Sequence, residues 1–310
     1  MEYSVSIRTV APNPHTDRLL QSLMEQSFKP AEIDIVLPHN NNPNELWIAM
    51  YPNIRFIQSI KGMIAQRATG IKEARFKYVL LLDDDIVFTE SDAIERLFSQ
   101  MLKHDANMAL PYSPEAFPKG NTRFIHHLFG IAVPTTKRYL SYTPGGGYYY
   151  PKKVSFEQPY EVEGGRGCCI AADRDFLLKY GLYGDPELER INYALREDGA
   201  FVADIARHGG KAILVGNVSY EHLGVERKIN PKRLYHSYEA SVFNNYLFWR
   251  KYVKVRYRQP LLPQIAFGWH VTGVFVFALL VSLKYNSFQP ILGALKGLRR
   301  IAYQLRKNKR

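Results

Sequence analysis

Three consecutive carboxylates, Asp83-Asp84-Asp85, are the residues whose types and spacing most clearly permit chemistry. They follow the apolar run 79–82, which is typical of a buried strand in a parallel sheet. Open α/β sheets bind ligands at the carboxyl ends of their strands. Adjacent carboxylates repel one another, and hard divalent ions such as Mg²⁺ or Mn²⁺ relieve that repulsion while keeping sites for phosphate oxygens. The triplet therefore predicts a metal–diphosphate site, with a solvated acidic loop as the alternative.

Two further polar groups stand where a helix or strand is expected to begin or end. Glu197-Asp198 opens a helical stretch, and His222 follows a strand and offers a nitrogen ligand. Taken singly, an acidic pair at a helix start is also typical of capping, and a lone histidine is typical of a surface. Together with the aspartate triplet they predict a metal-assisted transferase.

The elements that must position these residues alternate strand and helix over the first hundred residues. Strands are expected at residues 3–9, 33–37, 54–57 and up to the triplet, and helices at 16–26, 61–74 and 91–104. Farther on, we expect a strand at 168–172, a helix at 174–180, one or two helices over 188–207, and a closing strand pair at 212–215 and 218–220. This rhythm predicts an α/β fold with a doubly wound, mostly parallel sheet flanked by helices.

Two stretches in the middle of the chain leave alternatives open. The aromatic, glycine-rich segment 143–151 predicts a flexible loop, either an active-site lid whose tyrosines stack on a sugar or base, or a plain surface connection. Cys168 and Cys169 are adjacent, so they cannot join distant segments. Without a spaced Cys/His set they are expected to be core residues in a reducing compartment.

In this order and spacing the motifs resemble those of the family 2 glycosyltransferases with the GT-A fold, over about residues 3–224. The segment 62–70, with Arg67, is similar to the family's ARNxG segment, and Leu82-Asp83-Asp84-Asp85 is similar to its DxD motif. The acceptor-side half is matched, in order, by 167–174, Gly184-Asp185, Glu197-Asp198, Gly209 and His222.

The resemblance implies an inverting transfer of a sugar from a nucleotide-diphosphate donor to a hydroxyl of a glycan acceptor, with Mg²⁺ or Mn²⁺ as cofactor. It implies that Asp85, with Asp83, and His222 hold the metal. Arg67 would contact the diphosphate, and Asp198 would be the general base for the acceptor hydroxyl. The other residues expected at the site are Thr9, His39, Asp83 and Asp84 on the donor side, and Gly165, Arg166 and Glu197 on the acceptor side.

One departure from the family concerns the nucleotide base. Where the family carries an Asp-rich turn after its second strand, this chain reads Leu37-Pro38-His39-Asn40. Either His39 and Asn40 recognise the base, or the donor carries a base other than uracil.

Basic charge is concentrated in the C-terminal third. Residues 225–310 hold 17 Lys/Arg and 2 Asp/Glu, leaving 24 of the 41 basic and 27 of the 29 acidic residues for the rest. This predicts a polyanionic partner, either nucleic acid or anionic lipid. The uncharged segment 261–283 would be about 35 Å long as a helix and favours an anionic membrane surface over nucleic acid. Residues 288–306 predict an amphipathic helix with a cationic side.

We therefore expect a glycosyltransferase domain at 1–224, with a nucleotide-sugar half at about 1–110 and an acceptor half at about 111–224, and a membrane-associating appendage at 225–310. The segment 261–283 is expected to form a monotopic or interfacial arrangement, a single span, or a buried core helix. No secretory signal is expected, because Met1-Glu2 leads directly into a strand. The catalytic body would then act at the cytoplasmic face of a membrane on a lipid-linked acceptor of a cell-surface polysaccharide.

Two other functions remain open. A metal-dependent nucleotidyltransferase also combines this fold class with acidic ligands, but the turn after the first strand, 11–14, lacks the glycines of a phosphate loop. A non-catalytic membrane scaffold of a polysaccharide-assembly complex would keep the fold without needing the acidic motifs.

Overall fold

The computed structural model describes residues 1–112, 118, 120, 122–136, 139–152, 157–191, 193–224, 230–259 and 261–307. Residues 225–229, 260 and 308–310 of the expected appendage, and residue 192 of the expected helical stretch 188–207, lie outside the described residues. The chain divides into two compact units. The first comprises Met1–Pro114, Val154–Gly184 and Phe201–Glu226, and the second Glu115–Lys153, Asp185–Ala200 and Arg227–Arg310.

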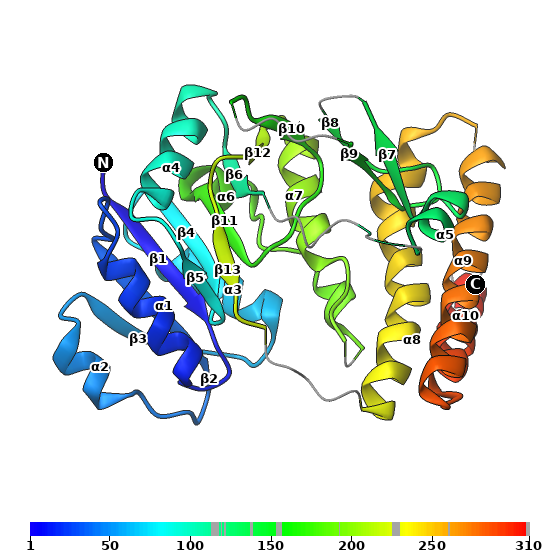
Figure 1. Cartoon of the computed structure of the whole chain (residues 1–310), viewed down its shortest axis with the longest axis horizontal. Coiled ribbons are helices and arrows are strands. Elements are labelled where there is room, and N and C mark those ends of the chain that lie inside the picture. The colour runs from blue at the N-terminus through cyan, green and yellow to red at the C-terminus, as the bar shows by residue number, and fades with distance from the viewer. Residues whose placement is uncertain are drawn as a thin grey trace. The chain divides into compact units, whose positions relative to one another are not determined.

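A mostly parallel sheet is the centre of the first unit, in the order β3-β2-β1-β4-β11-β6-β12-β10 (Figure 1). Its strands are β1 (Tyr3–Arg8), β2 (Glu32–Pro38), β3 (Ile54–Ser59), β4 (Tyr78–Asp83), β6 (Met108–Pro111), β10 (Tyr160–Val162), β11 (Cys169–Asp173) and β12 (Ala212–Val215). β1, β2, β3 and β4 pair in parallel, whereas β11 runs antiparallel to β4 and β6. The predicted α/β fold class is confirmed.

Helices cover both faces of this sheet. In β1, large apolar side chains and small serines alternate, so that each face packs against a different helix. Tyr3, Val5 and Ile7 face the apolar cluster, and Ser6 lies on the other face, against α3. Gly70 of α3 lies so close to Ser6 that a side chain there would overlap the serine hydroxyl. The helices of this unit are α1 (Pro14–Met24), α2 (Glu45–Met50), α3 (Met63–Glu73), α4 (Ala93–Lys103) and α6 (Arg174–Tyr180). Helices on two faces of a parallel sheet are the doubly wound arrangement.

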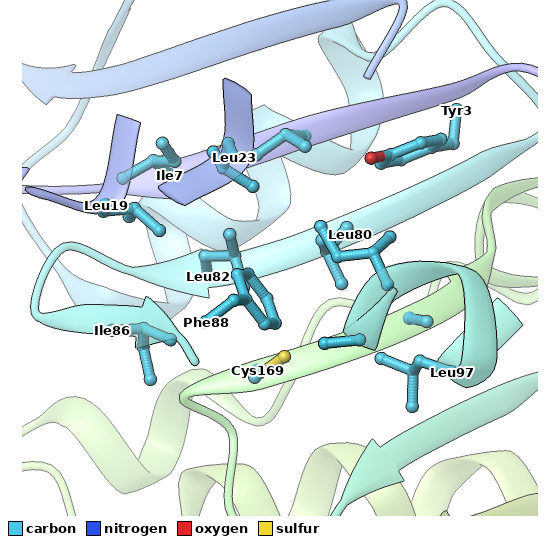
Figure 2. Packing of buried hydrophobic residues seen from close by; sticks show 14 of the residues in the cluster. Tyr3, Ile7, Leu19, Leu23, Leu80, Leu82, Ile86, Phe88, Leu97 and Cys169 are labelled. Atoms are coloured by element: carbon cyan, nitrogen blue, oxygen red, sulfur yellow. The ribbon is translucent and has the colours of Figure 1, made fainter. Parts of the chain in front are cut away.

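The hydrophobic core joins the two strands that carry the candidate site. Figure 2 shows Leu19 and Leu23 of α1 beside Ile7, above Leu80 and Leu82 of β4. Cys168 and Cys169 are buried and neither forms a disulfide, and burial raises the pKa of the Cys169 thiol. The expectation that these cysteines are core residues is confirmed.

Three local expectations were wrong. The first helix begins at Pro14, not Thr16, because the side chain of Asn13 accepts hydrogen bonds from the His15 and Thr16 amides and Pro14 suits the first turn. Over 188–207, where one or two helices were expected, the described residues form one helix, α7 (Glu197–Arg207), which begins nine residues later than expected and follows the 3₁₀ turn Pro186–Glu189. The last strand, β13 (Tyr220–His222), pairs with β5 (Ile86–Phe88) and not with β12.

In the second unit, the segment 143–151 is a turn followed by a strand, not one flexible loop. β9 (Tyr148–Pro151) pairs in parallel with β7 (Ala132–Thr135). The Thr143 amide donates to the Gly147 carbonyl at 2.9 Å, and the Gly146 amide donates to the Thr143 carbonyl at 2.8 Å. The other elements before the long helices are α5 (Thr122–Leu128) and β8 (Tyr139–Leu140).

Long helices dominate the rest of the second unit, and α8, α9 and α10 lie side by side (Figure 1). α8 (Pro231–Phe248) continues as a π-helical turn, Trp249–Val253, and a 3₁₀ turn, Lys254–Arg256. α9 spans Leu261–Tyr285 and α10 spans Gln289–Lys307. Among the described residues, α9 is the one helix long and apolar enough to cross a membrane, and 28% of its most apolar window is buried.

Two glycines let α10 contact α8 at backbone distance. A side chain at Gly293 would overlap the carbonyl oxygen of Tyr235, and one at Gly297 would lie 2.7 Å from Val242 Cβ and 2.8 Å from the Glu239 carbonyl oxygen. Beside this contact, Arg300 Nε of α10 donates to the buried carboxylate of Glu239 at 2.5 Å. α10 is therefore docked against its unit through small residues and a partly buried ion pair.

Candidate functional site

The aspartate triplet forms the turn between β4, which ends at Asp83, and β5, and each carboxylate has different neighbours. Asp83 forms an ion pair with Arg8, directly opposite it at the end of β1. Asp84 accepts hydrogen bonds from Thr9 Oγ1 and from Asn13 Nδ2, the latter at 2.9 Å. The end of β1 and the N-cap of α1 thus fix two carboxylates of the triplet.

Opposing effects act on the pKa of Asp84. Burial raises it, and the hydrogen bonds from Thr9 and Asn13 act in the lowering direction but do not cancel burial. The neighbouring charges of Asp83 and Asp85 raise it further. Like charges brought together at a strand end have this effect, and a bound cation would relieve it.

The third carboxylate, Asp85, is paired with His222. The antiparallel pairing of β13 with β5 places His222 opposite Ile86, and the Leu223 amide donates to the Asp85 carbonyl at 2.8 Å. His222 Nε2 then lies 3.3 Å from Asp85 Oδ1. The hydrogen bond to Asp85 is the main cause that raises the pKa of His222, while burial and the charge of Arg166 lower it.

The chemistry of this donor pair fits a hard divalent cation. Asp85 offers an oxygen and His222 a nitrogen, and both ends are held by backbone pairing. A site with two protein ligands leaves positions for phosphate oxygens and water, as Mg²⁺ and Mn²⁺ sites in transferases do. Within the described part of the chain, no cluster of three or more His, Cys, Asp or Glu residues could hold a metal by itself.

Arg67 lies buried in α3 at 3% exposure, with its guanidinium 4.8 Å from the centre of the Phe201 ring. Its neighbour Gln66 joins the ends of two strands, because Gln66 Nε2 donates to the Thr9 carbonyl at 2.7 Å and to the Val36 carbonyl at 2.8 Å. α3 therefore presents a cationic side chain at the edge of the sheet that carries the triplet.

Sequence reasoning missed Arg8, Asn13 and Gln66, which hold the strand ends in place. Arg8 carried a signal, because it is a charged residue at the end of the apolar strand beginning at Tyr3. Asn13 also carried one, since Asn-Pro is a typical helix start. Gln66 carried none, since its partners lie 30 and 57 residues away.

The other expected donor and acceptor residues of the first unit are less enclosed. His39 is exposed, and its backbone amide donates to the Ser59 carbonyl at 2.9 Å. Gly165 packs against β6, where an added Cβ would lie 2.6 Å from Leu110 Cδ2. Arg166 is close enough to His222 to lower its pKa. The roles expected for these residues stay predictions.

Glu197 and Asp198 form the first turn of α7 and, up to Ala200, belong to the second unit. The preceding residue, Arg196, has a positive φ of 71°. Its Nε donates to Asn245 Oδ1 at 2.6 Å and its Nη2 to the Gly146 carbonyl at 2.9 Å. After the pair, the Gly199 carbonyl accepts from Tyr142 Oη at 3.0 Å. The acidic pair is thus bracketed by fixed contacts on both sides.

A family model connects this arrangement to known proteins. The model described as "Glycosyl transferase family 2" matches residues 14–180, more than half of the 310-residue chain. The chain belongs to glycosyl transferase family 2. No curated protein matches it.

Solved structures of glycosyltransferases share the fold. Mannosyltransferase PcManGT from Pyrobaculum calidifontis, in complex with GDP-Man and Mn²⁺, has a TM-score of 0.55 at 14% identity, covering 96% of this chain and 87% of that one. GalNAc-T7 with UDP, GalNAc and Mn²⁺ has a TM-score of 0.53 at 14% identity, covering 87% of this chain and 56% of that one. S. aureus TarS 1-349 has a TM-score of 0.50 at 13% identity, covering 89% of this chain and 72% of that one. The protein is a glycosyltransferase with a GT-A fold.

Proposed function

We propose that this protein is an inverting, metal-dependent glycosyltransferase that moves a sugar from a nucleotide-diphosphate donor to a hydroxyl of a glycan acceptor. The pairing of Asp85 with His222 at 3.3 Å carries the proposal. It joins a carboxylate and an imidazole at the carboxyl end of a central strand, where α/β sheets bind ligands. The similar structures PcManGT and GalNAc-T7 bind nucleotides together with Mn²⁺.

In this proposal Asp85 and His222 hold Mg²⁺ or Mn²⁺, and the aspartates Asp83 and Asp84 shape the donor side with Thr9 and His39. The bound ion would neutralise charge on the nucleotide diphosphate as it leaves. Arg67 adds a buried positive charge for the same anion. Buried charge in a site of low polarity acts more strongly than charge in water, because fewer solvent dipoles screen it.

Asp198 is the proposed general base, with Gly165, Arg166 and Glu197 on the acceptor side. Its carboxylate would take the proton from the acceptor hydroxyl as the oxygen attacks the anomeric carbon. The C–O bond to the diphosphate breaks as the new C–O bond forms, so the configuration at that carbon inverts. Asp198 stands three residues before Phe201 in α7, and Phe201 is the ring that Arg67 contacts.

The C-terminal helices suit attachment to an anionic membrane at the cytoplasmic face, where a lipid-linked acceptor would be found. Large apolar side chains on α9, in the turn after it and on α10 are exposed, among them Leu283 at 71%, Phe288 at 78% and Tyr303 at 70%. Lys296, Arg299 and Arg306 of α10 provide positive charge for lipid headgroups.

A donor screen tests the proposal. The full chain in detergent is incubated with a panel of nucleotide sugars and Mn²⁺, Mg²⁺ or EDTA, and release of nucleotide diphosphate is measured. We expect slow, metal-dependent hydrolysis of one donor, lost in Asp85→Asn and kept in Asp105→Asn. Asp105 is an exposed aspartate with a positive φ of 48°, which asparagine also tolerates. Hydrolysis unaffected by EDTA and by Asp85→Asn would overturn the metal assignment.

A further inference from the structure

One stretch of the chain, mostly in the second unit, contains basic residues but no acidic ones. No Asp or Glu occurs between Glu115 and Glu157, whereas Lys and Arg occur six times there. These are Lys119, Arg123, Lys137, Arg138, Lys152 and Lys153. This surplus of positive charge in the sequence favours an anionic ligand.

Residues of three elements of this stretch line one shallow cavity of about 710 Å³ that is open to solvent. α5 contributes Arg123, Phe124 and His127, the cavity wall continues with Pro134 of β7, and Lys152 follows directly on β9. Among the residues the structure describes there, the lining holds two permanent cations and an imidazole and no carboxylate. Guanidinium and ammonium groups around one space match the oxygens of a phosphate or diphosphate.

Hydrogen bonds connect Arg123 and Lys152 to the strands β7 and β9. Arg123 Nε donates to Tyr150 Oη at 3.1 Å, which ties α5 to β9. The Lys152 amide donates to the Thr135 carbonyl at 3.0 Å, which continues the β7–β9 pairing. The Arg123 side chain is thus tied to β9 and the Lys152 backbone to β7, and both side chains remain exposed to solvent.

The same segment contacts Arg196, which lies two residues before the candidate base Asp198. Gly146, whose carbonyl accepts from Arg196, lies six residues before Lys152. An extended strand rises about 3.3 Å per residue, so the two positions are at most roughly 20 Å apart. An acceptor bound beside Gly146 and Arg196 would therefore lie within this distance of a phosphate held by Lys152.

The apolar helix α9 adjoins the cavity through α5. The His126 ring lies 4.4 Å from that of Phe277, and Trp269 Nε1 donates to the Leu128 carbonyl at 2.8 Å. Phe124 at the cavity is itself 72% exposed. A ligand with an anionic group and an apolar chain would meet both kinds of surface within this one unit.

We propose that the cavity lined by Arg123, His127 and Lys152 binds a phosphate or diphosphate group of the acceptor. The identification of the ligand as the acceptor rests on the proposed function. The anion-binding site itself rests on the charge and geometry of the second unit, so it can be tested without turnover.

The experiment is a titration of the full chain in a nonionic detergent with inorganic pyrophosphate, in EDTA so that the donor site holds no metal. Arg123→Gln/Lys152→Gln is expected to lose at least tenfold in affinity. Lys232→Gln/Arg233→Gln, which removes the same two charges near the start of α8, is expected to bind as the native chain does. Equal affinity in the native chain and the Arg123/Lys152 variant would overturn the proposal.

Two further arms distinguish the source of the phosphate. Geranyl diphosphate should bind more tightly than pyrophosphate and show the same loss in the variant. Binding to phosphatidylglycerol vesicles should be unchanged by the variant; if vesicle binding is lost and pyrophosphate binding is not, the cations serve the bilayer and the proposal is wrong. Metal-dependent donor hydrolysis, measured on the same variant, should persist. If the native chain binds pyrophosphate but does not hydrolyse any donor, the proposed function is rejected and the anion-binding site is retained.

Discussion

Arg196 and Asn245 form a hydrogen bond of 2.6 Å that joins the residue before the acidic pair to the last turn of α8. Asn245 Nδ2 in turn lies 3.2 Å from His270 Nε2 of α9. Burial lowers the pKa of Arg196, but the nearby Tyr142 and Tyr148 act in the opposite direction. Arg196 is charged despite its burial, and its backbone has a positive φ. These two costs indicate that the hydrogen bonds of its guanidinium position the residues that follow.

Replacing this guanidinium tests that role. Arg196→Lys keeps the charge but cannot donate to both Asn245 and Gly146 in the same geometry. Loss of one or two buried charge-assisted hydrogen bonds should cost about 1.5–3 kcal/mol of unfolding free energy each. If Arg196 positions Asp198, kcat should fall while KM for the donor stays the same, as measured by steady-state kinetics and thermal melting.

The matched control is Arg190→Lys, because Arg190 is exposed and its ion pair with Glu187 is long, at 3.4 Å. Its kcat and melting temperature should stay near the native values. A fall in kcat for Arg196→Lys that is fully explained by unfolding at the assay temperature would count against a positioning role.

Asp198→Asn should remove the general base and keep the donor site. We expect transfer to fall by about 10²- to 10⁴-fold, the range typical for loss of a general base. Donor binding in the presence of Mn²⁺, measured by isothermal titration, should be unchanged. Asp204→Asn, in the same helix, serves as control, and retained transfer in Asp198→Asn would place the base elsewhere.

Removing either partner of the Asp85–His222 pair should weaken Mn²⁺ binding. Even a residue that only orients a metal ligand contributes about 10- to 100-fold in affinity, so Asp85→Ala or His222→Ala should reach at least that range. Glu221→Ala provides a control on the same strand with an exposed side chain. Titration with Mn²⁺, followed by paramagnetic relaxation of water, gives the affinities directly.

The raised pKa of His222 predicts how metal binding depends on pH. A metal needs the neutral imidazole, so Mn²⁺ affinity should fall roughly tenfold per pH unit below that raised pKa. The stability effect of the pair without metal has the opposite sign. It is fully present below the ordinary histidine pKa of about 6.5 and is lost as the pH rises through the raised value. His222→Gln should abolish both dependences in Mn²⁺ titrations and in melting curves recorded from pH 5 to 9.

Membrane attachment is best tested by point substitutions rather than by deleting α9 and α10. A deletion would remove Arg300 and leave the buried carboxylate of Glu239 without that ion pair. Leu283→Gln/Phe288→Gln changes only exposed side chains and should lower partitioning into anionic vesicles by tenfold or more, since each large apolar side chain contributes about 1.5–3 kcal/mol when buried. Leu46→Gln/Ile60→Gln removes side chains that are each 71% exposed in the first unit and should leave partitioning unchanged.

Most strands and helices of the first unit were predictable because their patterns are local, whereas α2, β5, β6 and β10 are short and were not predicted. The apolar run of β4 and the alternation of Tyr3, Val5 and Ile7 with Ser4 and Ser6 in β1 specify a buried and a two-faced strand in themselves. The position of the triplet at a strand end followed from the same run. The long apolar and amphipathic helices α9 and α10 were also visible, since their periods extend over many residues.

The fine structure of the site was less visible because it depends on distant partners. Nothing near His222 indicates that β13 pairs with β5, more than 130 residues earlier. Nothing near Asp83, one of the expected metal ligands, indicates that its carboxylate pairs with Arg8, 75 residues earlier in the chain. The tyrosines of β9 read as a loop because glycines precede them, whereas parallel pairing with β7 decides their conformation.

The glycines of α10 have a mechanical consequence. Because Gly293 and Gly297 bring its backbone against α8, α10 is closely packed on α8. If the exposed side chains of α10 bind lipid, as proposed, a displacement of α10 would also displace α8, whose Asn245 holds the arginine that precedes Asp198. Lipid attachment would then act on the start of α7 as well as anchor the protein.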